Sequence, residues 1–514
     1  MTKNRTYLKG IIRWISLLGI SFLMVACVKK ASKSIDRSDM GSIRPNIVYI
    51  LADDMGYGDL SSLNPDSGIK TPNMDKIVEE GMYFTDAHSN SAVCTPTRYG
   101  ILTGRYAWRS RLKEGVLWGY DPPLIEADRT TVASFLKDNG YNTACIGKWH
   151  LGLGWQAKNP ELPIAKYEWN REFEEGADSN VDFGKKVSGP NTLGFDYSYI
   201  IPASLDMTPY LYLENEKATE LPKAYTAGKS QDVDGRGVFW RPGEVAPSFD
   251  FYNVLGHLTD KATDYIVQQK TNKEPFFLYF PLTAPHTPWL PTDEVNGISQ
   301  AGLYGDFVAL VDKTVGQVMK ALEESGQAGN TLIIVTSDNG SNWTIKDMEQ
   351  YEHRANYIYK GQKADIYEGG HRIPFIVRWP EKIRPGSVSD QVICTTDLLA
   401  TVSGIIGKEL PKGAGEDSYD IFPAFTEKAQ EQIRDYTVHH SLNGFFAIRK
   451  GDWKLTTSLG SGGFTQPTKI GPEEGRPIGT LYNLRDDQRE TNNIYDENPE
   501  IVRELLAVLT EARK

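Results

Sequence analysis

The stretch NIVYILADD, residues 46–54, is an apolar run that ends directly in two carboxylates. An uninterrupted apolar run of this length is typical of a strand that is buried on both faces of a sheet. Residues 331–336, TLIIVT, form a second run of the same kind. Patterns typical of helices lie between such runs, at residues 73–81, 130–139, 257–269 and 304–325. This alternation predicts an α/β fold, with a large mixed, mostly parallel β-sheet sandwiched by helices.

Oxygen-bearing side chains end both strand-like runs. Asp53 and Asp54 close the first run, and Asp338 and Asn339 follow the second. If the two strands are neighbours in one sheet, these side chains converge at its C-terminal edge, which is where α/β folds place their sites. An all-oxygen set suits a hard cation such as Ca²⁺ or Mg²⁺. The alternative is that Asp and Asn only cap the turns after the strands, which is their commoner role.

The remaining patterns predict the domain organisation. Residues 159–249 are rich in Gly, Pro, Asn and aromatic residues and have weak periodicity, so we expect long loops over the sheet rather than a separate domain. After residue 402 the pattern changes to short strands, followed by an amphipathic helix from Pro499 to the end. We therefore expect a main α/β domain over residues 45–402 and a smaller C-terminal α+β domain over residues 403–514.

The N-terminus resembles a secretory signal. Several cationic residues precede an apolar run at residues 14–26, which is too short for a comfortable membrane span. The run ends in LMVAC, residues 23–27, which resembles a bacterial lipobox. We expect residues 1–27 to be a lipoprotein signal ending at a lipidated Cys27 and residues 28–44 to be a flexible tether. The protein would then be periplasmic or on the cell surface; the alternatives are an ordinary cleaved signal or a short anchor.

Composition limits the partners. The 514 residues carry a formal net charge of -11. A negative long-range field repels polyanions, so we expect no nucleic-acid partner and no contact with the membrane except through the N-terminal lipid. An anionic substrate must therefore be held by local cations.

Cysteines are few after the N-terminal region, and only Cys94, Cys145 and Cys394 remain. An oxidising compartment permits a disulfide between Cys145 and Cys394. Both lie in apolar, strand-like contexts, where buried free thiols are common. We favour free thiols at these two positions.

Cys94 stands in the segment AVCTPTRYGILTG, residues 92–104. Thr95 and Pro96 can start a helix that Gly104 ends, which places Cys94 at the helix N-terminus, where backbone N–H groups and the dipole favour an anion. Arg98 adds a cation one turn further on. A catalytic thiolate is the general interpretation of such a residue, and a buried structural cysteine is the alternative.

This segment resembles the Cys-x-Pro-x-Arg signature of the type I, formylglycine-dependent sulfatases of the alkaline phosphatase superfamily. A second family signature is matched by GYNTACIGKWH at residues 140–150. Two long signatures in the right order make coincidence negligible. The resemblance extends from about residue 46 to residue 380 and implies an alkaline-phosphatase-like fold. Further matches are the two strand-end motifs, APHTP at residues 284–288, Lys363, and EGGHRIP at residues 368–374.

The resemblance implies the cofactor chemistry. A maturation enzyme would oxidise Cys94 to formylglycine, whose hydrated form supplies an oxygen nucleophile. A single Ca²⁺ would polarise this nucleophile and a sulfate oxygen. Its ligands would be the modified Cys94 together with Asp53, Asp54, Asp338 and Asn339.

The resemblance also implies roles for the remaining site residues. Arg98 and Lys148 would hold the hydrated nucleophile, while Lys148 and Lys363 would balance charge on the sulfuryl oxygens. His286 is expected to protonate the leaving oxygen, with Lys363 as a second candidate. His150 would then take a proton from the second hydroxyl so that sulfate is expelled.

The implied activity is hydrolysis of sulfate monoesters, with a sulfated carbohydrate as the expected substrate. Relatives with the same signature act on phosphorus, so a phosphonate or phosphate ester hydrolase is the nearest alternative. An inactive, glycan-binding surface lipoprotein is the alternative from another class. Four residues near Lys363 are weaker candidates for substrate contact, although Arg372 can equally brace the Gly-Gly turn: His353, Arg354, His371 and Arg372.

Overall fold

The computed structural model describes residues 44–164, 180–230, 236–471, 474 and 477–514. The predicted signal peptide with Cys27, and all of the predicted tether except its last residue, lie outside the described residues. Within the described ranges, no helix combines the length and the apolar character needed to span a bilayer.

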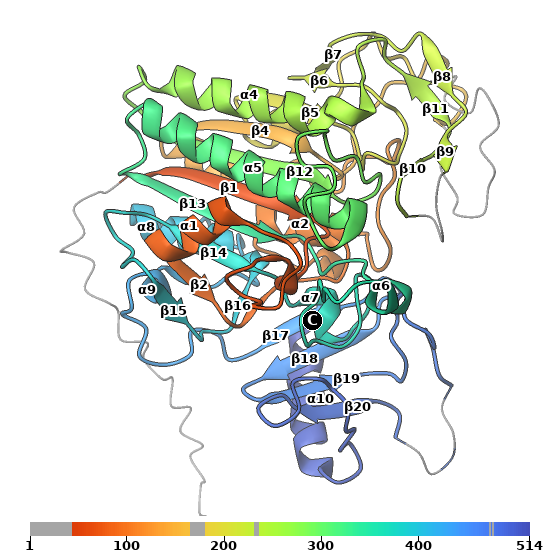
Figure 1. The fold of residues 1–514 in the computed structure, drawn as a ribbon, viewed down its shortest axis with the longest axis vertical. Helices are drawn as coiled ribbons and strands as arrows, with labels where there is room; N and C mark the ends of the chain where they lie inside the picture. Colours follow the sequence, from red (N-terminus) through yellow and green to blue (C-terminus); the bar gives the residue numbers. More distant parts are fainter. Residues whose placement is uncertain (1–43, 165–179, 231–235, 472–473, 475–476) are drawn as a thin grey trace, which may run out of the picture. The chain divides into compact units, whose positions relative to one another are not determined.

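A ten-stranded sheet forms the centre of the fold, in the order β15-β2-β14-β13-β1-β12-β4-β5-β6-β7 (Figure 1). β1 (Asn46–Asp53) pairs in parallel with β12 (Phe276–Pro285) and with β13 (Thr331–Ser337). β4 (Asn142–Lys148) joins β12 to β5 (Tyr197–Ile201), again in parallel. The predicted mixed, mostly parallel sheet is confirmed. Antiparallel pairs occur toward both edges, where the strands are β14 (Phe375–Arg378), β2 (Met82–Phe84), β15 (Ser387–Ser389), β6 (Leu213–Glu214) and β7 (Lys217–Ala218).

Two groups of helices flank the sheet. α4 and α5 lie side by side across β12, and α1 packs against α5 (Figure 1). α2, α3 and α8 pack against one another. The four helices predicted from periodicity are all present, with ends that shift by at most a few residues. The bounds are α1 (Pro72–Glu80), α2 (Cys94–Thr103), α3 (Val132–Asp138), α4 (Val254–Gln269), α5 (Gly302–Glu324) and α8 (Leu398–Ile406).

The expectation of long loops over residues 159–249 was wrong in one respect. Tyr197–Ile201 forms β5, which is an integral strand of the main sheet beside β4. Its sequence, YSYII, is too short for its periodicity to be distinguished from that of an apolar loop segment. β6 and β7 of the main-sheet edge also lie in this segment. Its other strands are short and form two-stranded sheets: β8 (Ala224–Thr226) with β11 (Gly243–Val245), and β9 (Lys229–Ser230) with β10 (Phe239–Trp240).

A separate four-stranded antiparallel sheet follows near the C-terminus, in the order β17-β18-β19-β20 (Figure 1). The predicted amphipathic helix is α10 (Pro499–Ala512), whose Leu505 and Leu509 are buried in one core with this sheet. Trp108, which follows α2, belongs to the same core. The domain boundary at residue 402 stays a prediction. The strands are β17 (Thr437–His440), β18 (Phe446–Lys450), β19 (Trp453–Thr456) and β20 (Thr480–Asn483).

Short elements complete the described chain. α7 (Glu368–His371) is a single turn that ends just before β14, and α6 (Ile345–Gln350) follows the end of β13. β3 (Ala87–His88) pairs with β16 (Ile393–Cys394) outside the main sheet. Cys145 on β4 and Cys394 on β16 are buried free thiols, as predicted.

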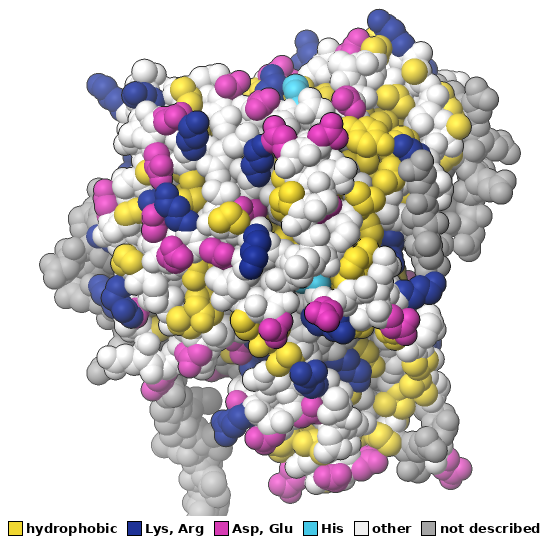
Figure 2. All heavy atoms as spheres, viewed as in Figure 1, with side chains coloured by type: hydrophobic (Ala, Val, Ile, Leu, Met, Phe, Trp, Pro, Cys, Tyr) yellow, Lys and Arg dark blue, Asp and Glu magenta, His cyan; other side chains and the backbone are white. Residues whose placement is uncertain are grey.

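Charged groups of both signs alternate over the face that Figure 2 shows, among the residues described there. On this face the acidic side chains are interspersed with basic ones. A site that holds an anion must rely on cations of its own, and these are found inside the molecule.

Candidate active site

The C-terminal ends of β1 and β13 bring four strand-end residues together. Ala52 pairs with Ser337, so the residues that follow them leave the sheet at the same edge. The backbone N–H of Asp54 donates to Asp338 Oδ1 over 3.1 Å, and Asn339 Nδ2 donates to Asp54 Oδ1 over 2.7 Å. Asp54 has a φ of 68°, a left-handed conformation that Asp tolerates better than most residues. The strand-end residues are Asp53, Asp54, Asp338 and Asn339.

Three buried cations neutralise the three carboxylates. Lys148 Nζ, at the end of β4, lies 2.7 Å from Asp53 Oδ2. Arg98 Nη2, from α2, lies 2.7 Å from Asp338 Oδ2 and 3.4 Å from Asp53 Oδ1. Lys363 Nζ lies 2.6 Å from Asp54 Oδ2. These are the local cations that the acidic composition required.

Asp53 and Asp338 have opposite pKa shifts, although both are buried. Burial alone would raise the pKa of Asp53, but the charges of Lys148, then His286 and Arg98, outweigh it and hold this pKa well below its usual range. Burial, followed by the charge of Asp53, raises the pKa of Asp338 in spite of Arg98. Asp53 is therefore the firmly ionised member of the pair.

The strand-end oxygens fit a hard cation. Asp53 Oδ1 and Asn339 Oδ1 are buried and accept no hydrogen bond from any described residue. The Asn339 amide nitrogen donates to Asp54 Oδ1 and to the carbonyl of Gly340. These bonds fix the orientation of the amide, so Asn339 Oδ1 is the atom that has no donor among the described residues. A buried oxygen without a donor costs on the order of 1–3 kcal/mol, which a bound cation would remove. Ligand atoms of Asp53, Asp54 and His286 lie close enough together to hold one ion.

Cys94 is the first residue of α2 and is only 3% exposed. Hydrogen bonds fix the start of this helix: Thr95 Oγ1 donates to the His150 carbonyl and Thr97 Oγ1 donates to the Ser91 carbonyl. Burial raises the pKa of the Cys94 thiol against the lowering effect of Lys148 and Lys363. A reactive thiolate needs a lowered pKa, so the thiolate interpretation is disfavoured.

His150 and His286 have defined tautomers because each ring contacts a carbonyl, which can only accept. His150 Nε2 donates to the Leu117 carbonyl over 2.7 Å, which leaves Nδ1 as a bare acceptor with no partner among described residues. His286 Nδ1 donates to the Thr287 carbonyl over 2.6 Å, so its Nε2 faces Asp54 Oδ2 at 3.7 Å. Burial is the main cause that lowers the pKa of both rings.

The weaker candidates near Lys363 have other partners. His353 Nε2 contacts Asp59 Oδ1 at 2.8 Å, and Arg354 donates to nearby backbone carbonyls. His371 stacks on His439 with ring centroids 3.9 Å apart. Arg372 Nε donates to Glu368 Oε2 over 3.0 Å across the Gly-Gly turn, which is the bracing role.

Sequence reasoning missed Ser204, which follows β5. Its Oγ lies 3.2 Å from Lys148 Nζ and 3.3 Å from His286 Nδ1, so it links the two. No motif marks this position, because it lies in the weakly periodic segment; only the pairing of β5 with β4 brings it here.

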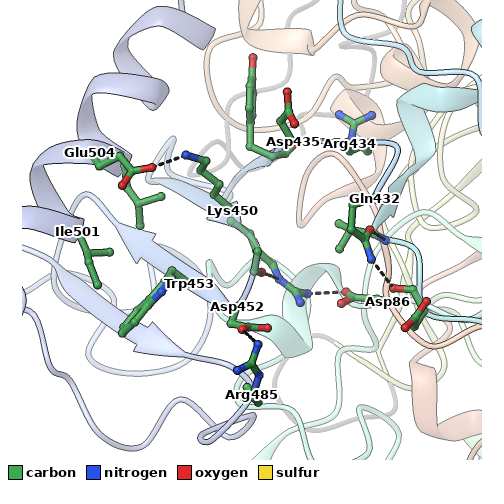
Figure 3. A pocket seen from close by; sticks show the side chains of 16 residues that line it. Asp86, Gln432, Arg434, Asp435, Lys450, Asp452, Trp453, Arg485, Ile501 and Glu504 are labelled. Carbon is green, nitrogen blue, oxygen red and sulfur yellow. Dashed lines mark hydrogen bonds and ion pairs between the residues drawn. The ribbon is translucent and has the colours of Figure 1, made fainter. Parts of the chain in front are cut away.

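A pocket of about 640 Å³ lies elsewhere, between the C-terminal sheet and the loops around Asp86 and Gln432 (Figure 3). Figure 3 shows its cations already facing carboxylates, with Lys450 against Glu504 and Arg485 against Asp452. Arg434 and Arg449 are likewise ion-paired. The residues that line this pocket include neither Cys94 nor any of the strand-end residues, so it is separate from the candidate site.

Comparison with known proteins identifies relatives of the whole described fold. The model of the Sulfatase family matches residues 45–408, and the model described as N-sulphoglucosamine sulphohydrolase, C-terminal, matches residues 359–514. An N-acetylgalactosamine-6-O-sulfatase of Bacteroides thetaiotaomicron is 32% identical over 98% of this chain and 100% of its own length.

Solved structures agree with this result. A protein studied for the metabolism of multiple glycosaminoglycans by Bacteroides thetaiotaomicron superposes with a TM-score of 0.78 and 32% identity, over 92% of this chain and 100% of the other. A phosphonate monoester hydrolase of Agrobacterium radiobacter has a TM-score of 0.58 and 17% identity, over 91% of this chain and 95% of the other. The second likeness shows a shared fold alone.

Proposed function

The chain belongs to the sulfatase family and is a sulfuric ester hydrolase, and from this premise we propose that it removes O-sulfate groups from a sulfated carbohydrate. The observation that carries the proposal is the convergence of the four strand-end residues, Cys94 and three buried cations at one edge of the sheet. The carbohydrate is supported by the named activity of the 32% identical relative. N-acetylgalactosamine 6-sulfate is therefore the first substrate to test.

Formylglycine at position 94 and one Ca²⁺ are part of this proposal. The unsatisfied oxygens of Asp53 and Asn339 and the ionised carboxylate of Asp53 support a Ca²⁺ held by the four strand-end residues and the modified Cys94. When bound, the ion would polarise a sulfate oxygen and the nucleophile. A maturation enzyme would have to supply the modification.

The side chains around Cys94 suit the charge changes of the reaction. Lys148 and Lys363 are close enough to lower the thiol pKa of Cys94, so the same cations would balance negative charge that develops on a sulfuryl group beside it. Arg98, paired with Asp338 and Asp53, keeps the carboxylates in register with the helix start.

The two histidines suit proton transfer at stated atoms. His150 offers Nδ1 as an acceptor, because its Nε2 proton is bound by the Leu117 carbonyl. His286 Nε2 is the atom that would pass a proton to the leaving oxygen. His286 would have to be protonated at Nε2 first, because its Nδ1 proton is bound by the Thr287 carbonyl. Asp54 raises the pKa of Lys363 against the effect of burial, so Lys363 keeps its proton at neutral pH and is the second candidate for direct donation to the leaving oxygen.

A phosphonate or phosphate ester hydrolase remains the alternative to test. Its distinguishing result would be a higher kcat/KM for an aryl phosphonate than for the corresponding aryl sulfate. An inactive glycan-binding protein is disfavoured, because such a protein would be expected to lack the nucleophile position or the strand-end ligands, and here all converge.

The test of the proposal is intact and peptide mass on active enzyme. Oxidation of the Cys94 thiol to the aldehyde requires a loss of about 18 Da at its peptide. Cys94→Ala should be inactive. Cys94→Ser can attack but lacks the second hydroxyl that His150 would deprotonate, so a covalent sulfate adduct should accumulate on it. A fully active enzyme with an unmodified thiol at Cys94 would show the formylglycine mechanism to be wrong.

A further inference from the structure

The loop after β5 carries a second acidic residue beside the candidate site. Ser204, which links Lys148 and His286, is followed two residues later by Asp206. Asp206 is 5% exposed, and its Oδ2 forms an ion pair with Arg241. None of the sequence motifs includes Asp206 or Arg241.

The second carboxylate oxygen of Asp206 is unsatisfied. Oδ1 is buried and accepts no hydrogen bond from the described residues. Burial would raise the pKa of Asp206, but Arg241 and then His286 outweigh it and lower this pKa to about 2, so the group is ionised at neutral pH. A buried, ionised oxygen without a donor is costly, which points to a ligand that brings the donor.

Arg241 is held in place on several sides. Its guanidinium carbon lies 5.1 Å from the centroid of the Trp118 ring and 5.0 Å from that of Phe239. The Tyr210 hydroxyl donates to the Arg241 carbonyl over 2.7 Å and lies 3.1 Å from the Asp206 carbonyl. An arginine fixed by stacking and by a carboxylate is preorganised for recognition.

The Asp206–Arg241 pair adjoins the candidate site from two directions. Leu117, whose carbonyl binds His150, is followed directly by Trp118, which stacks on Arg241. On the other side, the charges of His286 and Lys148 act on Asp206. His286 faces the position of the leaving oxygen under the proposed function, and its charge acts on Asp206 more strongly than that of Lys148 does, which favours a position of Asp206 toward the departing alcohol.

We propose that Asp206, held by Arg241, accepts a hydrogen bond from a free sugar hydroxyl next to the sulfated position and thereby determines specificity. The inference rests on the proposed carbohydrate substrate. A hydroxyl is the donor that a sugar offers beside its sulfate ester, and Arg241 can donate to the same oxygen. A second sulfate at that position would meet the Asp206 carboxylate, and like charges would exclude it.

The test compares substrates that differ only at this hydroxyl. In N-acetylgalactosamine 6-sulfate the nearest ring hydroxyl to the ester is on C4. The wild type should have a kcat/KM about 10- to 100-fold higher for this sugar than for its 4-deoxy analogue, and should turn over the 4,6-disulfate more slowly still. This comparison uses only the wild-type enzyme, so its result does not depend on whether variants fold.

Variants then assign the effect to Asp206. The reference substrate is 4-nitrophenyl sulfate, which has no neighbouring hydroxyl. In Asp206→Asn, kcat/KM for N-acetylgalactosamine 6-sulfate should fall about 10- to 100-fold relative to kcat/KM for this reference. The variant should distinguish the sugar from its 4-deoxy analogue less than the wild type does, because the charged acceptor is lost. Asp417→Asn is the matched control, because Asp417 is also a buried carboxylate paired with an arginine, Arg109. This substitution should change kcat/KM for the sugar and for the aryl sulfate by the same factor.

The outcomes distinguish the role of Asp206 from the identity of the substrate. Equal losses on the sugar and on the aryl sulfate in Asp206→Asn, or equal wild-type rates on the sugar and its 4-deoxy analogue, would overturn the role of Asp206 and leave the carbohydrate sulfatase intact. Turnover of the aryl sulfate with no turnover of any sulfated sugar would overturn the proposed substrate, and this inference with it.

Discussion

Acidification from pH 7 to pH 5 should destabilise the fold through its buried histidines. Burial is the leading cause that lowers the pKa of His88 and His440 from 6.5 to about 4. Below pH 6.5 the unfolded chain takes up protons that the folded chain refuses. Their stabilising contribution is therefore complete above pH 6.5 and is lost as the pH falls toward about 4.

The size of this effect follows from the pKa difference. A histidine with a folded pKa of about 4 contributes a loss of about 2 kcal/mol between pH 7 and pH 5. The ring of His440 lies 5.5 Å from that of Trp108 and 6.1 Å from that of Phe446, so an apolar side chain fits its surroundings. In His440→Leu, the loss of unfolding free energy between the two pH values should be smaller by about 2 kcal/mol.

Urea unfolding followed by tryptophan fluorescence at both pH values measures this difference. His257→Gln is the control, because His257 is partly exposed on α4 and its substitution should leave most of the pH dependence in place. If His440→Leu loses as much stability as the wild type between pH 7 and pH 5, His440 is not neutral in the fold and the reasoning is refuted.

Other perturbations test the metal, the anchor and a helix end. Stripping divalent cations should abolish turnover and lower the melting temperature, with Ca²⁺ restoring both; stripped protein that melts unchanged would argue against a cation at the strand-end residues. Cys27→Ala should release an active enzyme from the membrane fraction, whereas a mature N-terminus other than modified Cys27 would contradict lipidation. Gly104→Ala should cost about 1 kcal/mol or more of unfolding free energy, since φ is 62° and the new Cβ would lie 2.9 Å from Gly415 Cα. Gly407→Ala, at a helix end with φ of 65° and open space, is its control, and equal melting of the two variants would show that the close approach is harmless.

Sequence predicted the fold where a pattern is long enough to be periodic. The runs that became β1 and β13, and the helices α4 and α5, are each long and consistent, so their type could be inferred. The pairing of β1 with β13 was only a condition of the sequence argument, and the structure supplies it. β5 was missed because the five residues YSYII are too few to define a period.

The site was predictable to the extent that motifs carry it. The residues around Cys94 lie in signatures, and the structure places them together. Ser204 and Asp206 have no signature, since their positions depend on how β5 pairs with β4 and on where the following loop turns. Neither their proximity to His286 nor the bare oxygen of Asp206 can be deduced from residue order.

The burial of α2 determines whether the modification of Cys94 comes before or after folding. Every residue of this helix is buried, and Cys94 is 3% exposed beneath the strand-end carboxylates and their cations. A modifying enzyme must reach the thiol of Cys94. In the completed fold this thiol is buried and therefore not accessible to another protein. If Cys94 is oxidised as proposed, the reaction has to precede the closing of the sheet edge. Chains that fold before they are modified would then be stable but inactive. The active fraction of a preparation would depend on the relative rates of folding and modification, not on an equilibrium between two forms.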